Sequence, residues 1–214
     1  MAESDNLKTA PQNDQENKRK EVKEKVLNLL RKVRRPGIDD MIRWLEESSF
    51  FDMPASTRFH GNYDGGLAEH SLNVYEAFVK LRNTYLQQFG GSDTIPIESV
   101  IICSLCHDFC KIDLYRKDYR NVKNRETGQW EQKEVYTYAD PYGLGHGECS
   151  MYLVQSFINL NMKEAQAIRW HMGAYDSAVK GGDYSINVGM SDNPLATLLN
   201  MADTWASTFM EETR

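Results

Sequence analysis

Apolar residues recur every three or four positions through most of this sequence, which is the spacing of an amphipathic helix. The pattern starts at Val22, Val26 and Leu29, and a Pro36-Gly37 pair ends the first helix. Further helices are predicted for residues 39–47, 67–89, from Pro96 through the segment SVIICSLCHDFCKI, 146–160, 163–171 and 193–210. The chain is therefore predicted to be mostly α.

Residues 115–138 interrupt this pattern. Two segments rich in tyrosine, tryptophan and valine flank the turn signal Glu126-Thr127-Gly128, which predicts a β-hairpin. Residues 1–20 are polar with mixed charges and cannot bury enough surface to order themselves, so a disordered tail is predicted there. The expected architecture is a single helical domain over residues 21–214, a bundle with one inserted hairpin.

The balance of charges excludes some classes of protein. Lys and Arg number 25 against 31 Asp and Glu, a net charge of −6, which excludes a generally basic protein that coats nucleic acid. No apolar run approaches the roughly 20 residues that span a bilayer, and the first twenty residues lack the apolar core of a signal peptide. A cytoplasmic protein without membrane contact is expected. Cys103, Cys106 and Cys110 form a stripe on one predicted helix and are interpreted as core residues, not as a zinc site.

The five histidines carry most of the functional information; they are His60, His70, His107, His146 and His171. A lone histidine on an apolar helix face is usually a hydrogen-bonded core residue. Here three of them, His70, His146 and His171, lie on apolar faces of three different predicted helices. Asp203 likewise follows Leu195 and Leu199 on the inward face of the last helix. A buried carboxylate needs a partner, and a metal ion could also gather the inward imidazoles.

His107 and Asp108 are adjacent on a helix whose earlier part is almost entirely apolar. Neighbouring helical side chains diverge by about 100°, so both can reach one metal only if it lies between them, against that helix. His70 from the preceding helix and Asp203 from the last helix can then complete a set of two histidines and two aspartates.

This order of residues resembles the HD superfamily of metal-dependent phosphohydrolases, which is named for the His-Asp doublet. The resemblance covers about residues 56–206. It implies a first metal site made of His70, His107, Asp108 and Asp203. As in the two-metal subgroups of that superfamily, it implies a second site made of Asp108, His146 and His171.

Three short segments, GNYDGGLAEH, CHDFCK and GHGE, are similar to the HD domain of bacterial 3′-to-5′ exoribonucleases. Those enzymes also carry an N-terminal oligonucleotide-binding barrel. The first 55 residues of this chain are too short and too helical for such a barrel, so none is expected there.

The ligand set predicts one or two divalent ions per chain, with Mn²⁺, Fe²⁺, Ni²⁺ or Zn²⁺ favoured over Mg²⁺ because imidazoles contribute. Such ions activate water for direct attack on a phosphoester or phosphoanhydride. Asp108 and Lys111 are the predicted catalytic residues, with Lys111 one helical turn after His107 and able to neutralise charge on the phosphate. Arg58 and His60 lie in the irregular loop before Gly65 and are candidate phosphate contacts, although a purely structural loop explains them equally well.

The sequence favours an enzyme, a metal-dependent phosphohydrolase that acts on a nucleotide or nucleic-acid substrate, and three functions are compared. The first is hydrolysis of a phosphorylated small molecule, nucleotide or dinucleotide. The second is a phosphodiesterase or 3′-5′ exonuclease acting on single-stranded RNA or DNA, supported by five basic residues and one acidic residue in segment 116–125. A solvated hairpin explains that segment as well. The third is a non-catalytic HD binding module, against which the intact ligand set argues. The oligomeric state cannot be read from the sequence.

Overall fold

The computed structural model describes residues 10–90, 95–124 and 126–211, with side chains from residue 14 onward. The helices and strands are α1 (Ala10–Leu30), α2 (Ile38–Glu47), α3 (Gly66–Phe89), α4 (Ile97–Cys106), β1 (Tyr115–Lys123), β2 (Trp130–Tyr138), α5 (His146–Gln155), α6 (Met162–Trp170), α7 (Ser177–Lys180), α8 (Ser185–Met190) and α9 (Pro194–Trp205). Short turns of tighter or wider helix are η1 (Ser49–Phe51), η3 (Phe109–Lys111), η4 (Gly173–Tyr175) and η5 (Ala206–Met210). The predicted mostly α fold with one hairpin is confirmed.

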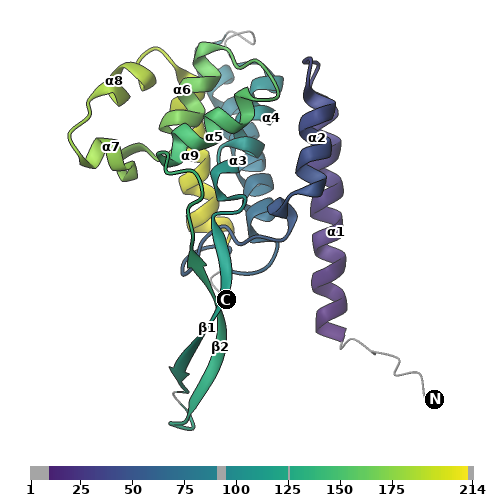
Figure 1. Ribbon diagram of the computed structural model, residues 1–214. Coiled ribbons are helices and arrows are strands. Elements are labelled where there is room, and N and C mark those ends of the chain that lie inside the picture. Colours follow the sequence, from purple (N-terminus) through teal and green to yellow (C-terminus); the bar gives the residue numbers. More distant parts are fainter. Residues whose placement is uncertain (1–9, 91–94, 125, 212–214) are drawn as a thin grey trace.

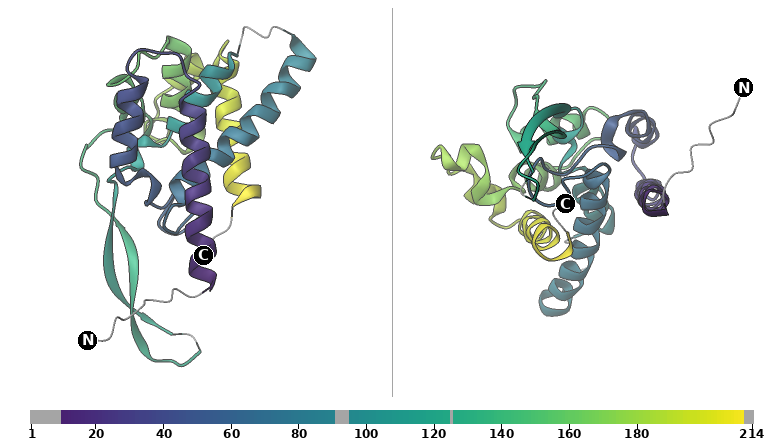
Figure 2. Two further views of the ribbon diagram at one scale, coloured as in Figure 1. Left: turned by 90° about the vertical axis from the view of Figure 1, so that its right-hand side faces the viewer. Right: turned by 90° about the horizontal axis from the view of Figure 1, so that it is seen from below.

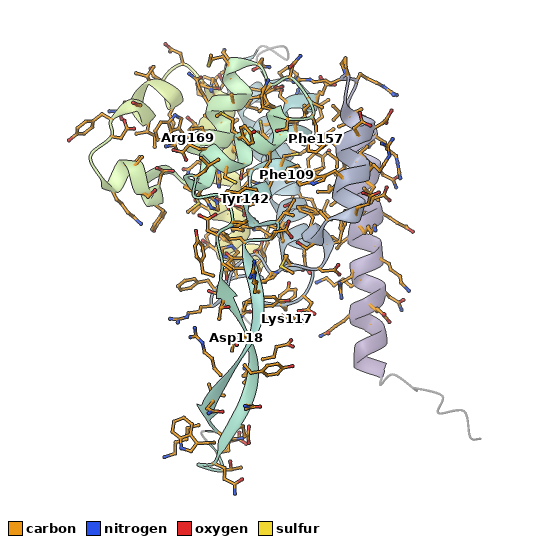
Figure 3. All side chains as sticks on the ribbon, viewed as in Figure 1. Phe109, Lys117, Asp118, Tyr142, Phe157 and Arg169 are labelled. Carbon is orange, nitrogen blue, oxygen red and sulfur yellow. The ribbon has the colours of Figure 1, made fainter. Side chains whose placement is uncertain are left out.

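The core lies between α3, α4, α6 and α9. Helix α3 packs against α4 and α9, and α6 packs against α9. Phe78 of α3 and Ile102 and Leu105 of α4 are fully buried there. On the other side, Trp44 of α2 packs against two phenylalanines, with its ring centroid 5.6 Å from that of Phe109 and 5.0 Å from that of Phe157. Both phenylalanines are labelled in Figure 3. The ends of α3, α4, α6 and α9 thus meet in one interior, which is where the inward histidines were expected.

Helix α1 begins earlier than the sequence predicted. The sequence predicts a disordered tail over residues 1–20, but residues 10–20 form the first turns of α1. Residues 1–9 lie outside the described part of the chain. The second half of α1 is anchored in the core by Val26 and Leu30. Once that half is nucleated, each added residue gains a backbone hydrogen bond. Lys18 then pairs with Glu69 at 2.6 Å, which ties the polar half to α3. Figures 1 and 2 show α1 lying along one side of the bundle.

The hairpin is antiparallel and long, and its nine residue pairs run from Tyr115 opposite Tyr138 to Lys123 opposite Trp130. Gly128 adopts a φ of 71° in the connecting turn, a conformation that glycine takes without strain. The two strands project beyond the helical body (Figures 1 and 2). No described helix is long and apolar enough to cross a membrane.

Two helices end sooner than the apolar pattern suggested. Helix α4, expected to continue past residue 107, ends at Cys106, and α5, expected to reach residue 160, ends at Gln155. The short helices α7 and α8 were not predicted. They follow η4 in a segment where most side chains are exposed, so it carries little apolar periodicity.

Candidate metal centre

His70 is placed by the start of α3. Gly65 has a φ of 83° and lets the chain turn into the helix, and a side chain on Gly66 would collide with the carbonyl of Gly61. His70 therefore lies just over one turn into α3, on the same buried face as Leu67 and Val74. Its side chain is 1% exposed.

His107 and His171 have the same local backbone geometry. Each is the C-cap of its helix, α4 or α6, with φ −58° and ψ −31°. Each places its Nδ1 near the carbonyl oxygen three residues earlier, His107 at 2.8 Å from Ser104 and His171 at 2.7 Å from Ile168. Because a carbonyl can only accept, Nδ1 of both rings is the donor, and Nε2 is the nitrogen that faces the cluster.

Asp108 stands at the centre of the cluster. The end of α4 at Cys106 gives Asp108 a non-helical backbone, φ −107° and ψ 21°, so its carboxylate can turn to the same side as His107. Its Oδ2 lies 3.5 Å from Nε2 of both His70 and His107. Its Oδ1 lies 2.8 Å from Nε2 of His146 and 3.6 Å from Nε2 of His171. The two oxygens of one carboxylate thus face two different pairs of histidines.

Asp203 closes the cluster from α9. Its Oδ1 lies 3.2 Å from Nε2 of His70 and 4.0 Å from Nε2 of His107. The structure therefore brings together all six side chains that the sequence singled out as ligand candidates; these are His70, His107, Asp108, His146, His171 and Asp203. Two overlapping groups, His70-His107-Asp203 and His107-Asp108-His171, each present ligand atoms within 4.8 Å of one another.

The donor set fits divalent metal ions. Burial lowers the pKa of His107 to about 3, so its ring is neutral and its Nε2 lone pair faces the cluster. Nε2 of His171 is buried without a hydrogen-bond partner among the described residues, and such an atom is costly unless a ligand satisfies it. Nε2 of His70 and of His107 lie 3.2 Å apart. Imidazole nitrogens and carboxylates converging in this way are typical of transition-metal sites.

Lys111 contacts the cluster by an ion pair with Asp108. The sequence expected it on the same continuous helix as His107, but it lies in the separate turn η3. Its Nζ is 2.7 Å from Oδ2 of Asp108 and the residue is 9% exposed. Burial opposes its charge, but the neighbouring Asp108 carboxylate outweighs burial and raises the Lys111 pKa above its ordinary value. A fixed positive charge thus lies beside the cluster.

The two loop residues differ in position. The half-buried His60 ring has its centroid 5.0 Å from that of His70, so it borders the cluster. Burial lowers its pKa, which leaves the ring neutral at pH 7. Arg58 is exposed, and the structure gives it no hydrogen bond or ion pair with a described residue. Only His60 is therefore brought to the site.

Glu211 belongs to the site and was missed by the sequence analysis. Its Oε1 lies 2.9 Å from Nδ1 of His70 and accepts a hydrogen bond from the side-chain amide of Asn73 at 3.2 Å. Burial would lower the pKa of His70, but the Glu211 and Asp203 carboxylates outweigh it and raise that pKa to about 10. Glu211 follows Asp203 by eight residues, which is the helical repeat already used for Leu195 and Leu199, and that spacing was the available signal.

The cysteines are buried and free. Cys103 and Cys106 pack in the core, as the sequence predicted. Cys110 also borders the site, because its Sγ lies 3.2 Å from Nδ1 of His146. This contact joins η3 to the start of α5, and it was not foreseen.

Two curated proteins are similar to this chain. A 3′-5′ exoribonuclease YhaM from Geobacillus sp. (strain WCH70) is 35% identical over 85 residues, which is 38% of this chain and 25% of that protein. A dihydroneopterin 2′,3′-cyclic phosphate phosphodiesterase from Methanocaldococcus jannaschii is 31% identical over 96 residues, 44% of this chain and 36% of that protein. Both are HD-domain phosphohydrolases. The resemblance to the HD superfamily is confirmed.

The match is to part of each relative, because this chain spans about a quarter to a third of their lengths. No family model matches the chain, and no solved structure does. Described residues 10–55 form α1, α2 and η1 followed by a loop, and they contain no barrel. The comparisons therefore show an HD-type likeness for part of this chain.

Proposed function

We propose that this HD-type domain is a metal-dependent phosphodiesterase that cleaves a phosphodiester bond of a nucleotide or nucleic-acid substrate. The observation that carries the proposal is the position of the Asp108 carboxylate. Its two oxygens face two separate pairs of histidines. Two-metal hydrolytic sites hold their ions about 3.5–4 Å apart, and a shared carboxylate suits that spacing.

In this proposal the first ion is held by His70, His107, Asp108 and Asp203. The second is held by Asp108, His146 and His171. Imidazole-rich sites favour Mn²⁺, Fe²⁺, Ni²⁺ or Zn²⁺ over Mg²⁺. When bound, divalent ions supply Lewis acidity toward phosphate oxygens and lower the pKa of water toward about 7.

The remaining side chains act on the substrate. Lys111 carries a fixed positive charge 2.7 Å from Asp108, so it can offset negative charge that develops on the phosphate. His60 borders His70 with a neutral ring and can donate a hydrogen bond to a phosphate oxygen. Arg58, on the exposed loop, is the weaker candidate for phosphate contact, because no described residue holds it near the cluster.

The activities of the two relatives narrow the substrate class. One is an exoribonuclease and the other a cyclic phosphate phosphodiesterase, and both reactions break phosphodiesters. We therefore favour phosphodiesters over phosphoanhydrides for this chain. A 3′-5′ exonuclease acting on single strands is the second candidate, supported by the exposed aromatic and basic residues of the hairpin.

Metal analysis followed by activity assays tests the proposal. The purified protein should contain or bind one to two transition ions per chain. With Mn²⁺ added it should hydrolyse bis-p-nitrophenyl phosphate faster than p-nitrophenyl phosphate. Asp108→Ala should lose both ions and activity while circular dichroism shows unchanged helix content. Full metal occupancy in Asp108→Ala would contradict the shared carboxylate, and bound metal without hydrolysis of any phosphoester would favour a non-catalytic binding module.

A further inference from the structure

The two faces of the hairpin carry different kinds of side chain. Successive residues of a strand point to opposite faces, and the register pairs Tyr115 with Tyr138, Lys117 with Tyr136, and Lys123 with Trp130. All five aromatic residues of the two strands therefore share one face; they are Tyr115, Tyr119, Trp130, Tyr136 and Tyr138. We call this the aromatic face. The opposite face carries Val122 and Val135 and no aromatic side chain.

The aromatic face is open along most of its length. Trp130 at the outer end is 70% exposed, Tyr119 is 64% exposed, and Tyr138 at the inner end is 67% exposed. The two strands project from the helical body, so these rings are not part of its core (Figures 1 and 3). Exposed apolar clusters of this kind mark binding surfaces.

The inner end of the aromatic face adjoins the metal centre. Strand β1 begins four residues after Lys111, and at the base of the hairpin Ala139 donates its backbone N–H to the carbonyl of Leu114 at 2.8 Å. Tyr136 donates from its hydroxyl to Asp64 at 2.6 Å, and Lys117 donates to the same carboxylate at 3.1 Å. Asp64 directly precedes the Gly65-Gly66 turn into α3. The hairpin is thus fixed to the loop that positions His70.

The charge of the hairpin differs from that of the rest of the chain. Residues 115–138 contain six Lys and Arg and four Asp and Glu, a net charge of +2 in a chain whose net charge is −6. Arg116, Arg120, Lys123 and Lys133 form no ion pair with a described residue, whereas Lys117 is paired with Asp64 and Glu134. An anionic partner is therefore favoured here more than elsewhere on the molecule. Of these four unpaired basic residues, Lys123 lies on the aromatic face, and the other three lie on the opposite face of the same two-stranded ribbon.

We infer that the aromatic face binds single-stranded nucleic acid, with bases stacked on Trp130 and Tyr119 and the strand led toward the His/Asp cluster. This inference rests on the proposed phosphodiesterase function and names its substrate class. Aromatic rings accept any base, since every base has a π face, and stacking contributes about 1–3 kcal/mol per base. Lys123, beside Trp130 at the outer end, is placed to contact a backbone phosphate.

Strand binding can be measured with the full chain and a fluorescein-labelled phosphorothioate 12-mer of thymidine. Trp130→Ala and Tyr119→Ala should each weaken binding about 10-fold to 100-fold, as the loss of one stacked base requires, whereas Trp130→Phe and Tyr119→Phe should retain most of it. The matched control is Val122→Ala with Val135→Ala, on the opposite face, which should bind like the wild type.

The salt dependence of binding tests the phosphate contact. Lys123→Ser should flatten the slope of log affinity against log salt by about 0.7, and Arg120→Ser, on the opposite face, should not.

Hydrolysis of bis-p-nitrophenyl phosphate separates this inference from the proposed function. All of these hairpin variants should hydrolyse that small substrate at the wild-type rate. A wild-type protein that hydrolyses it but does not bind the 12-mer, or binds it equally well without the two rings, overturns the inference alone. Aromatic variants that change the sedimentation coefficient and not strand affinity would show an interface between copies instead. A wild-type protein that hydrolyses no phosphodiester overturns the proposed function.

Discussion

At the scale of single residues, Lys111 is the side chain whose position says most about its role. It is nearly buried, and its only described ion-pair partner is Asp108. A lysine is costly to bury, and one salt bridge seldom compensates for that cost. The arrangement is explained if the charge acts on a substrate phosphate beside Asp108.

We predict that Lys111→Ala reduces kcat about 10²–10³-fold, the loss typical of removing one preorganised electrostatic group. Metal content should be unchanged, because no metal ligand is removed. Lys133→Ala, which removes an exposed lysine of the hairpin that forms no ion pair with a described residue, is the control and should keep the wild-type kcat on a small phosphodiester. Steady-state kinetics and metal analysis of both variants check this, and near-normal turnover of Lys111→Ala would show that the lysine has only a structural role.

Glu211 controls the protonation of His70. With a pKa of about 10, His70 holds a proton at pH 7 that a metal ion must displace from Nε2. Metal binding should therefore release about one proton from His70, and apparent affinity should rise about tenfold per pH unit between about pH 6 and 8. Glu211→Gln lowers the His70 pKa, so fewer protons are released and the pH dependence becomes shallower.

Calorimetry of Mn²⁺ binding in buffers of different ionisation enthalpy measures this proton release. Glu69→Gln is the matched control. Glu69 is adjacent to His70 in sequence, but it pairs with Lys18 on the surface, and its removal should leave the proton count unchanged. An identical proton count in Glu211→Gln and the wild type would contradict the role assigned to Glu211.

At the scale of elements, the second pair of histidines depends on how closely α5 approaches α6. His146 is the first residue of α5, and His171 caps α6. Gly147 lies against the carbonyl of Arg169, and a Cβ at Gly147 would overlap that oxygen. Only glycine allows the two helices to bring His146 and His171 to the same oxygen of Asp108.

Gly147→Ala should therefore separate His146 from His171 and lower the metal content from two ions to one, because His70, His107 and Asp203 come from other elements. Metal analysis after dialysis, with circular dichroism to confirm the fold, measures the stoichiometry. An unchanged count of two ions would show that α5 can shift without loss of the second site.

At the scale of the whole molecule, one charged network connects three segments. Arg35, between α1 and α2, donates to Glu164 of α6 at 2.7 Å and lies 3.3 Å from Glu98 of α4. Glu164 is fully buried, and it also accepts from the Ser99 hydroxyl at 2.6 Å. Burial opposes ionisation of Glu164, but Arg35 and Ser99 outweigh it and lower the Glu164 pKa. The N-terminal helices are thus attached to the half of the bundle that holds the metal centre.

We predict that Arg35→Met destabilises the protein by about 3–5 kcal/mol, because it leaves the Glu164 carboxylate buried without its partner. Arg43→Met removes a surface pair with Asp40 and should cost only about 0–1 kcal/mol. Urea denaturation of both variants measures the difference.

The same network sets a pH dependence. Since the Glu164 pKa is lower in the folded than in the unfolded state, its contribution is present above the ordinary glutamate pKa of 4.5 and is lost as the pH falls below that value. Equal losses of stability in Arg35→Met and Arg43→Met at pH 7 would contradict the network.

The sequence by itself determined the helical class, the hairpin and the set of inward ligand candidates. Helical periodicity and turn residues are local properties, so they place His70, His146 and Asp203 on buried faces without knowledge of the packing. The role of those side chains as metal ligands stays a prediction, as do the boundaries of the single domain.

Only the tertiary structure decided which distant groups meet. Glu211 reaches His70 across 141 positions of sequence, and Cys110 meets His146 across 36. Helix α4 ends at Cys106, and this end turns Asp108 toward both histidine pairs. No glycine or proline marks the end of the helix in the sequence, and the apolar pattern continues past it. Contacts of this kind depend on how helices pack around a shared core, and helix packing is a property of the whole chain that local spacing does not contain.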